Sequence, residues 1–176
     1  IEVPPGRRPL LSKKDCRCFF DQLSLPRAIR PWTGRPPVCI NEFIQFGGMT
    51  REEFAGFLPD STRLRGSDVF SPVSRVWRMG FAWSSFVAQS TLLACCREAG
   101  LRDNMCICDS QPKPDVSAEA LALATDDVMH FTTGSRDVSQ ARMASLDGAL
   151  LREGIEKHPK KDEIGIENGI CIGVDL

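Results

Sequence analysis

The 176-residue sequence contains no run of eighteen consecutive apolar residues, which excludes a membrane-spanning helix. Its first eleven residues include three prolines and lack the apolar stretch of a secretory signal peptide. We therefore expect an intracellular protein, cytoplasmic or nuclear, that is not secreted and has no membrane partner.

Paired C-x-x-C motifs are also absent, which argues against a zinc knuckle. The eight cysteines occur as two C-x-C pairs, one adjacent pair and two single residues. The two histidines, His130 and His158, are not spaced as metal ligands. We expect reduced structural thiols. A small zinc- or thiol-dependent module is an alternative that stoichiometric bound zinc would support.

A strong net charge is the third missing feature, since the whole chain carries −1. The charge is nevertheless uneven. Residues 1–36 hold eight basic and three acidic side chains, a balance of +5, and the remainder holds fourteen and twenty, a balance of −6. Such a division suits a protein that holds a polyanion on one side and a metal on the other, although a solvated surface explains it equally well.

The composition is that of an ordinary globular domain, with 42% hydrophobic and 26% charged residues. The stretch 10–20 predicts a short strand with Asp15 near its end. Residues 121–131 form two alternating apolar runs around Asp126-Asp127, which predicts a tight β-hairpin with both aspartates at its turn. Taken alone, these two aspartates are better explained as solvated turn residues.

Two longer helices are expected. The stretch 78–100 combines a glycine-containing loop, a serine cap and a helix closed by Gly100, and residues 139–151 carry apolar side chains at helical spacing. Thr50 to Glu53 has the form of a capping box and predicts a short helix through Phe57. Prolines break the other patterns in 21–77, where we expect loops with short elements.

A second hairpin is predicted by Asn168-Gly169, which lies between the apolar runs 164–167 and 170–174. The expected order is strand, loops, helix, hairpin, helix, hairpin. This order predicts an α+β fold of the split βαβ, ferredoxin-like kind, with two helices packed on one face of an antiparallel sheet.

Four blocks of the sequence carry a resemblance to a known family. They are residues 11–20 around Asp15, residues 78–85, residues 124–127, and Lys160-Lys161 followed by 170–174. In this order they resemble the palm domain of reverse transcriptases, the RNA-dependent DNA polymerases of retroelements, and especially those of retrotransposons. The resemblance implies a single palm domain over residues 1–176 with partial fingers, an irregular insertion at 38–75, and neither a thumb nor an RNase H domain.

The resemblance also implies a chemistry, the addition of deoxynucleoside triphosphates to a primer 3′-hydroxyl on an RNA or DNA template. It assigns Asp15, Asp126 and Asp127 as ligands of two Mg²⁺ or Mn²⁺ ions. Carboxylates are the ligands that Mg²⁺ prefers, and three of them close together without a cation raise at least one pKa by repulsion. A cation would therefore account for such a cluster.

Further roles follow from the same resemblance. Phe20 lies against the sugar of the incoming nucleotide and excludes a 2′-hydroxyl. Arg78, Met79 and Gly80 form the loop behind the templating base pair. Lys161, or Lys160 on a one-residue slip, stabilises charge on the pyrophosphate or donates a proton to it.

Two positions differ from the family pattern. Ala124 stands where an aromatic residue precedes x-Asp-Asp, in a sequence without any tyrosine, and Arg78 stands where a proline commonly precedes Met-Gly. The alternative function is a catalytically inactive retroelement remnant that keeps the palm fold as a nucleic-acid-binding or structural piece. No oligomeric state follows from the sequence.

Overall fold

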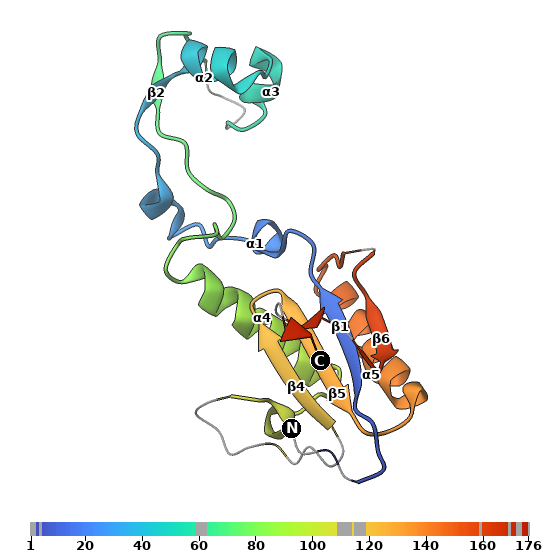
Figure 1. The fold of residues 1–176 in the computed structure, drawn as a ribbon. Helices are drawn as coiled ribbons and strands as arrows, with labels where there is room; N and C mark the ends of the chain where they lie inside the picture. The colour runs from blue at the N-terminus through green and yellow to red at the C-terminus, as the bar shows by residue number, and fades with distance from the viewer. Residues whose placement is uncertain are drawn as a thin grey trace. The chain divides into compact units, whose positions relative to one another are not determined.

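A computed structural model describes residues 3, 5–58, 63–108, 114, 119–158, 160–168, 170, 171, 174 and 175. The chain divides into two compact units (Figure 1). One unit comprises Ile1–Leu23 and Trp77–Leu176, and the other comprises Ser24–Val76. None of the helices in these described ranges is long and apolar enough to cross a membrane.

The first unit is built on a four-stranded sheet with the strand order β4-β5-β1-β6. Its strands are β1 (Leu10–Asp15), β4 (Glu119–Ala124), β5 (Asp127–Thr132) and β6 (Glu163–Ile166). All three pairings are antiparallel, which confirms the predicted antiparallel sheet with helices. Strand β1 lies in the interior of the sheet, so its side chains are covered on more sides than those of the edge strands.

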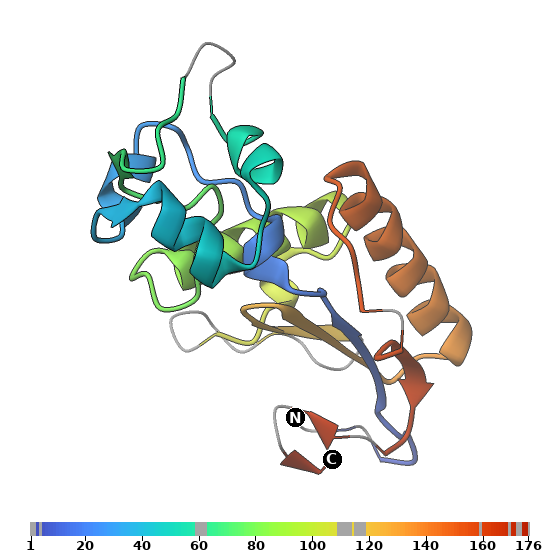
Figure 2. The same ribbon diagram turned by 90° about the horizontal axis from the view of Figure 1, so that it is seen from above.

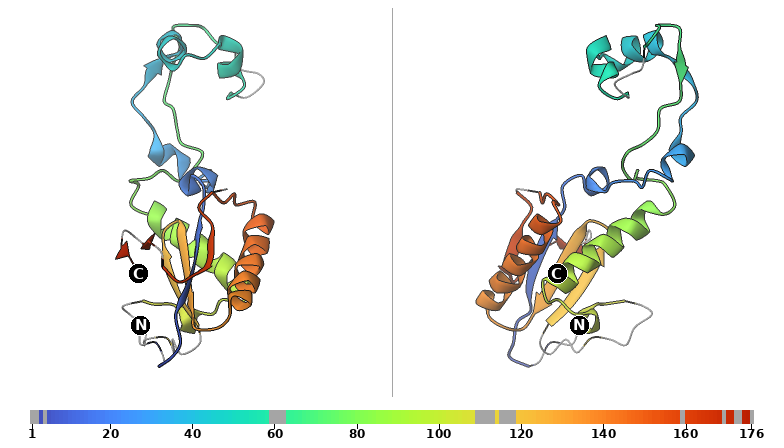
Figure 3. Two further views of the ribbon diagram at one scale, coloured as in Figure 1. Left: turned by 45° about the vertical axis from the view of Figure 1, so that its right-hand side comes forward. Right: turned by 180° about the vertical axis from the view of Figure 1, so that it is seen from behind.

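Two helices cover one face of this sheet, as Figures 2 and 3 show. They are α4 (Ser84–Glu98) and α5 (Arg136–Arg152). Helix α5 begins three residues before the predicted start, with Ser135 at its N-cap position. The buried side chains of the two helices are mainly small or aliphatic: Ser84, Ala88, Leu92, Cys95 and Cys96 on α4, and Ser139, Met143, Leu146, Ala149 and Leu150 on α5. Full burial of each leucine contributes about 1.5–3 kcal/mol.

Strand β1 alternates between two environments because successive side chains point to opposite faces of a sheet. Leu11 lies with Met129 in a small apolar cluster that also includes Ala122, Ala124, Phe131 and Ile166. Ser12 and Lys14, the residues of the opposite alternation, are both buried, and Lys14 forms an ion pair with Asp147 of α5. The helix-covered face of β1 is therefore polar.

The first predicted hairpin is confirmed, with one change in its turn. Ala124 pairs with Asp127, so the two turn residues are Thr125 and Asp126, and Asp127 is the first residue of β5. Thr125 has a φ of 55°, a left-handed conformation that is rare for a β-branched residue. The prediction of both aspartates in the turn was therefore wrong by one position.

The second predicted hairpin differs from the pairings in the described part of the chain. There β6 pairs with β1, and β7 (Ile170–Cys171) pairs with β8 (Val174–Asp175). Ile166 lies opposite Leu11 and joins its apolar cluster, and this burial favours the pairing of β6 with β1. Gly169, Ile172 and Gly173 of the predicted hairpin lie outside the described residues.

The second unit contains short elements, as predicted. They are the 3-10 helix η1 (Arg30–Thr33), β2 (Val38–Cys39), α2 (Ile40–Gly47), α3 (Arg51–Ala55) and β3 (Val69–Phe70). Three phenylalanine rings, those of Phe43, Phe54 and Phe70, pack edge to face with centroids 4.9–5.7 Å apart.

The capping box of α3 is confirmed. The Glu53 N–H donates to Thr50 Oγ1 at 3.2 Å, and the Thr50 N–H donates to Glu53 Oε2 at 2.7 Å. The helix ends at Ala55, two residues before the predicted end.

Candidate carboxylate site

Two of the predicted carboxylates lie opposite each other on the two central strands of the sheet, β1 and β5. Asp15 is the last residue of β1, Asp127 is the first of β5, and the strand register places them directly opposite. Opposite residues of an antiparallel pair project from the same face of a sheet. Asp126 lies beside them in the hairpin turn, where its carbonyl oxygen accepts a hydrogen bond from the Cys16 N–H at 3.0 Å. The fold thus brings all three aspartates to one end of the sheet.

A lysine completes this group. Lys161 Nζ donates to Asp15 Oδ2 at 2.6 Å, and this hydrogen bond is the main cause that raises the pKa of Lys161. Lys160 is exposed, and its backbone N–H donates to His158 Nδ1 at 3.3 Å. The contact with the carboxylates therefore belongs to Lys161. We refer to Asp15, Asp126, Asp127 and Lys161 as the carboxylate site.

The environment of Asp127 disfavours its charged form. Burial raises the pKa of Asp127 above its usual range. The nearby charge of Lys13 opposes this rise, whereas the carboxylates of Asp15 and Asp126 add to it. Asp127 Oδ1 is buried and has no hydrogen-bond partner among the described residues. A cation close to this oxygen would remove both the repulsion and the unsatisfied acceptor.

The donor chemistry of the carboxylate site fits a hard divalent cation, because its ligand atoms are carboxylate oxygens. Asp127 Oδ1 is such an oxygen and has no hydrogen-bond partner among the described residues. Asp15 Oδ2 already accepts a hydrogen bond from the Lys161 ammonium. A converged set of three histidine, cysteine or acidic side chains is nevertheless not found among the residues that the structure describes. The residue types are therefore suitable metal ligands, but in the described structure their side chains do not converge on a common metal position.

Cys16 lies next to the carboxylate site and is buried. Burial raises the pKa of its thiol to about 12, and the charges of Cys95 and of the three aspartates act in the same direction. The thiol is therefore neutral at physiological pH, and its environment favours a structural role over nucleophilic chemistry.

Phe20 follows the site in α1 (Phe19–Gln22), which begins four residues after Asp15. Phe19 is buried and anchors this short helix, whereas the Phe20 ring is only partly covered. This ring, five residues after Asp15 in the sequence, remains accessible and is free to contact a bound molecule.

The predicted loop at 78–80 lies just before α4, and α1 packs against α4. Gly80 has a φ of 88°, and a Cβ added there would meet no atom within 4 Å. The position therefore favours glycine for its backbone conformation and leaves open space above it. Met79 is 82% exposed and Arg78 is partly buried.

Two exposed aromatic rings follow this loop. Trp83 and Phe86 are both more than half exposed, and their rings pack edge to face with centroids 6.0 Å apart. Sequence reasoning did not select them, because a helix start with aromatic residues is equally typical of a buried core.

Sequence reasoning also missed four charged residues that form ion pairs with one another next to the carboxylate site. They are Lys14, Asp147, Lys157 and Asp162. One signal was available. Lys14 alternates with Asp15 along β1, so the two side chains lie on opposite faces, and a lysine on the helix-covered face needs an acidic partner.

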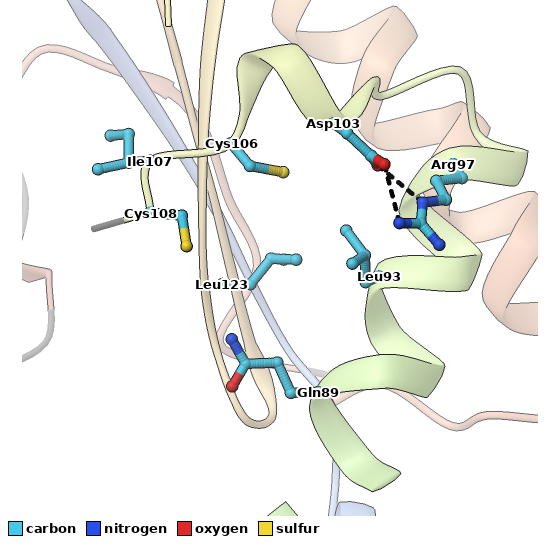
Figure 4. Close-up of a pocket in the computed structure, with 8 residues that line it drawn as sticks. All are labelled: Gln89, Leu93, Arg97, Asp103, Cys106, Ile107, Cys108 and Leu123. Carbon is cyan, nitrogen blue, oxygen red and sulfur yellow. Dashed lines mark hydrogen bonds and ion pairs between the residues drawn. The ribbon is translucent and has the colours of Figure 1, made fainter. Parts of the chain in front are cut away.

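A separate cavity of about 320 Å³ lies between α4 and β4 (Figure 4). It is lined by Gln89, Leu93, Arg97, Asp103, Cys106, Ile107, Cys108 and Leu123. Asp103, in the 3-10 helix η2 (Asp103–Met105), accepts two hydrogen bonds from Arg97 at 2.7 and 2.8 Å. No residue of the carboxylate site lines this cavity.

No protein-family model matches this chain, and no curated protein matches it.

Proposed function

We propose that this chain is the palm of an RNA-directed DNA polymerase of the retrotransposon type, which extends a primer 3′-hydroxyl with deoxynucleotides. The observation that supports the proposal is the juxtaposition of Asp15, Asp126 and Asp127 at one end of the sheet, with Lys161 on Asp15. Three acids and one lysine, drawn from three distant parts of the sequence, are the groups that phosphoryl transfer needs.

The three aspartates are the residues that would hold two Mg²⁺ or Mn²⁺ ions. Such ions activate the attacking 3′-oxygen and neutralise the leaving pyrophosphate. The chain would supply the oxygen ligands for them from the end of β1, from the turn between β4 and β5, and from the start of β5. The unpartnered Asp127 Oδ1 and the raised pKa of Asp127 make this carboxylate a group that gains from a nearby cation.

Lys161 would act as the proton donor. Its ammonium lies at the carboxylate site, and its raised pKa keeps Nζ protonated at neutral pH. A protonated Nζ at this position donates a proton to the pyrophosphate oxygen as the bond to the α-phosphate breaks. Its positive charge also stabilises the negative charge that develops on the leaving group.

The other predicted residues would select and seat the nucleotide. The partly exposed Phe20 ring, close to Asp15 along the chain, would exclude a 2′-hydroxyl and so favour deoxynucleotides. The loop of Arg78, Met79 and Gly80 would lie against the templating base pair, where the open space above Gly80 permits close approach.

A second candidate function is a catalytically inactive remnant that binds nucleic acid or has a structural role. The absence of a converged metal-ligand set among the described residues favours it, as does Ala124 in place of the family's aromatic residue. This candidate predicts binding of primer-template without any incorporation of nucleotide.

Primer extension on an RNA template with Mg²⁺ or Mn²⁺ separates the two candidates. The proposal predicts incorporation by the unaltered chain and a loss of about 100-fold or more in Asp126→Asn. Asp137→Asn, in an exposed residue at the start of α5, serves as the matched control and retains the rate. Template binding without incorporation by the unaltered chain would overturn the proposal, and so would an unchanged rate in Asp126→Asn.

A further inference from the structure

Lys14 is buried to 99% of its surface on the helix-covered face of β1, immediately before Asp15. Its Nζ lies 2.7 Å from Asp147 Oδ1 and 2.8 Å from Asp162 Oδ2. A buried ammonium is tolerated only when such partners compensate its loss of hydration. Lys14 is therefore fixed between α5 and the segment that precedes β6.

Lys157 joins the same two carboxylates from the exposed side. Its Nζ lies 3.0 Å from Asp147 Oδ2 and 2.7 Å from Asp162 Oδ2. Although burial opposes the shift, hydrogen bonds from Lys14 and Lys157 lower the pKa of Asp162. Two lysines and two aspartates form a neutral four-charge network (Lys14, Asp147, Lys157 and Asp162).

The chain around Asp162 is also tied to β1 through its backbone. We call residues 156–158 and 160–162 the strap. The Arg17 N–H donates to the Glu156 carbonyl at 3.0 Å, and the His158 N–H donates to the Asp15 carbonyl at 2.8 Å. These bonds hold the strap across the end of β1.

The network and the carboxylate site share neighbours along the chain. Lys14 immediately precedes Asp15, and Asp162 immediately follows Lys161. The ion pair of the network is therefore adjacent in sequence to the 2.6 Å ion pair of the carboxylate site. Because successive strand residues point to opposite faces, Lys14 holds the strap from behind while Asp15 faces the reacting groups.

We propose that the four-charge network is a positioning unit that sets the approach of Lys161 to Asp15. This inference rests on the proposed function, in which Lys161 donates the proton to pyrophosphate. The network members touch neither primer nor nucleotide. They act through Lys161 by fixing the backbone of the strap.

The decisive variant is Asp162→Asn, which keeps the side-chain shape and removes one charge from the network. It lowers kcat about tenfold and leaves KM for the nucleotide unchanged, since a small displacement of an acting group reduces rate more than binding. In a Lys161→Met background the same substitution has no further effect. Asp103→Asn, which breaks the exposed pair with Arg97, is the matched control and changes neither constant.

A purely structural role gives a different result. Asp162→Asn would then lower the rate by the same factor with Lys161 and with Met at position 161, and that outcome would overturn the inference. If Asp162→Asn fails to fold, Lys157→Met replaces it, because Lys157 lies on the exposed side and leaves Lys14 both of its partners.

Hydrogen exchange tests the inference without any polymerase activity. Exchange at the amides of His158 and Lys161 becomes at least about fivefold faster in Asp162→Asn and stays unchanged in Asp103→Asn. Unchanged protection of the strap in Asp162→Asn would contradict the positioning role. A chain that shows this exchange response and incorporates no nucleotide would refute the proposed function and leave the coupling of the network to the strap established.

Discussion

Lys161 donates a hydrogen bond of 2.6 Å to Asp15 across 146 residues of sequence. The pair places a positive charge on the carboxylate that also faces Asp127 across the sheet. Asp15 is thus the residue at which the predicted metal ligands and the predicted proton donor meet, and the proposed polymerase chemistry depends on this meeting.

Removal of the Phe20 ring is expected to relax sugar selection. Phe20→Ala increases incorporation of ribonucleotides relative to deoxynucleotides by about tenfold or more, because steric exclusion of the 2′-hydroxyl is lost. The ratio of kcat/KM for the two nucleotides measures the effect. Phe86→Ala, which alters an exposed ring on α4, is the control and leaves the ratio unchanged. An unchanged ratio in Phe20→Ala would remove this residue from the nucleotide site.

Asp127 is expected to destabilise the metal-free protein at neutral pH. Its folded-state pKa is raised, so the unfolded carboxyl ionises first, and stability falls as the pH rises from about 3.8 to the folded pKa. Asp127→Asn therefore raises Tm in EDTA at pH 7 and loses this gain below about pH 4. Because the group is partly exposed, solvent screening keeps this gain small.

Divalent metal ions should reverse the order of the Tm values of the unaltered protein and of Asp127→Asn. Addition of Mg²⁺ or Mn²⁺ raises the Tm of the unaltered protein and has a smaller effect on Asp127→Asn, because ligand binding to the folded state stabilises it. Equal metal-induced shifts in the two proteins would show that Asp127 is no ligand.

His130 is expected to make the protein sensitive to acid. It is fully buried on β5, and burial lowers its pKa, against the opposing charge of Glu119. The unfolded imidazole takes up its proton first, so stability is complete above about pH 6.5 and falls as the pH drops towards the lowered folded pKa. Urea unfolding at pH 7.5 and 5.5 measures this loss. His130→Gln reduces the difference between the two pH values, and an unchanged difference would assign the acid sensitivity to other groups.

Lys14 is expected to be far more important for stability than an exposed lysine. Lys14→Met leaves two carboxylates with only Lys157 and lowers the free energy of unfolding by about 3 kcal/mol. The double variant Lys14→Met/Asp147→Asn leaves the balanced pair Lys157–Asp162 and recovers most of this loss. Chemical denaturation of both variants tests the prediction. Equal instability of the single and double variants would show that packing, rather than charge balance, makes Lys14 important.

Local sequence signals predicted several elements well. Alternating apolar residues located the hairpin of β4 and β5 at the site, and the capping box located α3 in the second unit. The turn was displaced by one residue because Thr125 adopts a left-handed backbone that its residue type does not indicate. The contact between Asp15 and Lys161 was not predicted, since no local pattern relates residues so far apart.

Tertiary packing explains what the sequence did not reveal. Strand β6 pairs with β1 because Ile166 gains burial beside Leu11, an advantage that the Asn-Gly turn signal does not include. The network around Lys14 depends on α5, β1 and the strap meeting behind the sheet. The proximity of these four charged side chains can be predicted only once the strand order is known.

Single-nucleotide incorporation as a function of Mn²⁺ concentration tests the central claim most directly. The proposed function predicts incorporation that requires more than one Mn²⁺ ion per active chain and falls at least about 100-fold in Asp15→Asn, with Glu167→Gln as an exposed control that retains the rate. Incorporation that is equal in the unaltered chain and in Asp15→Asn, or that is absent from both at saturating metal and primer-template, would contradict the assignment of this fold as a polymerase palm.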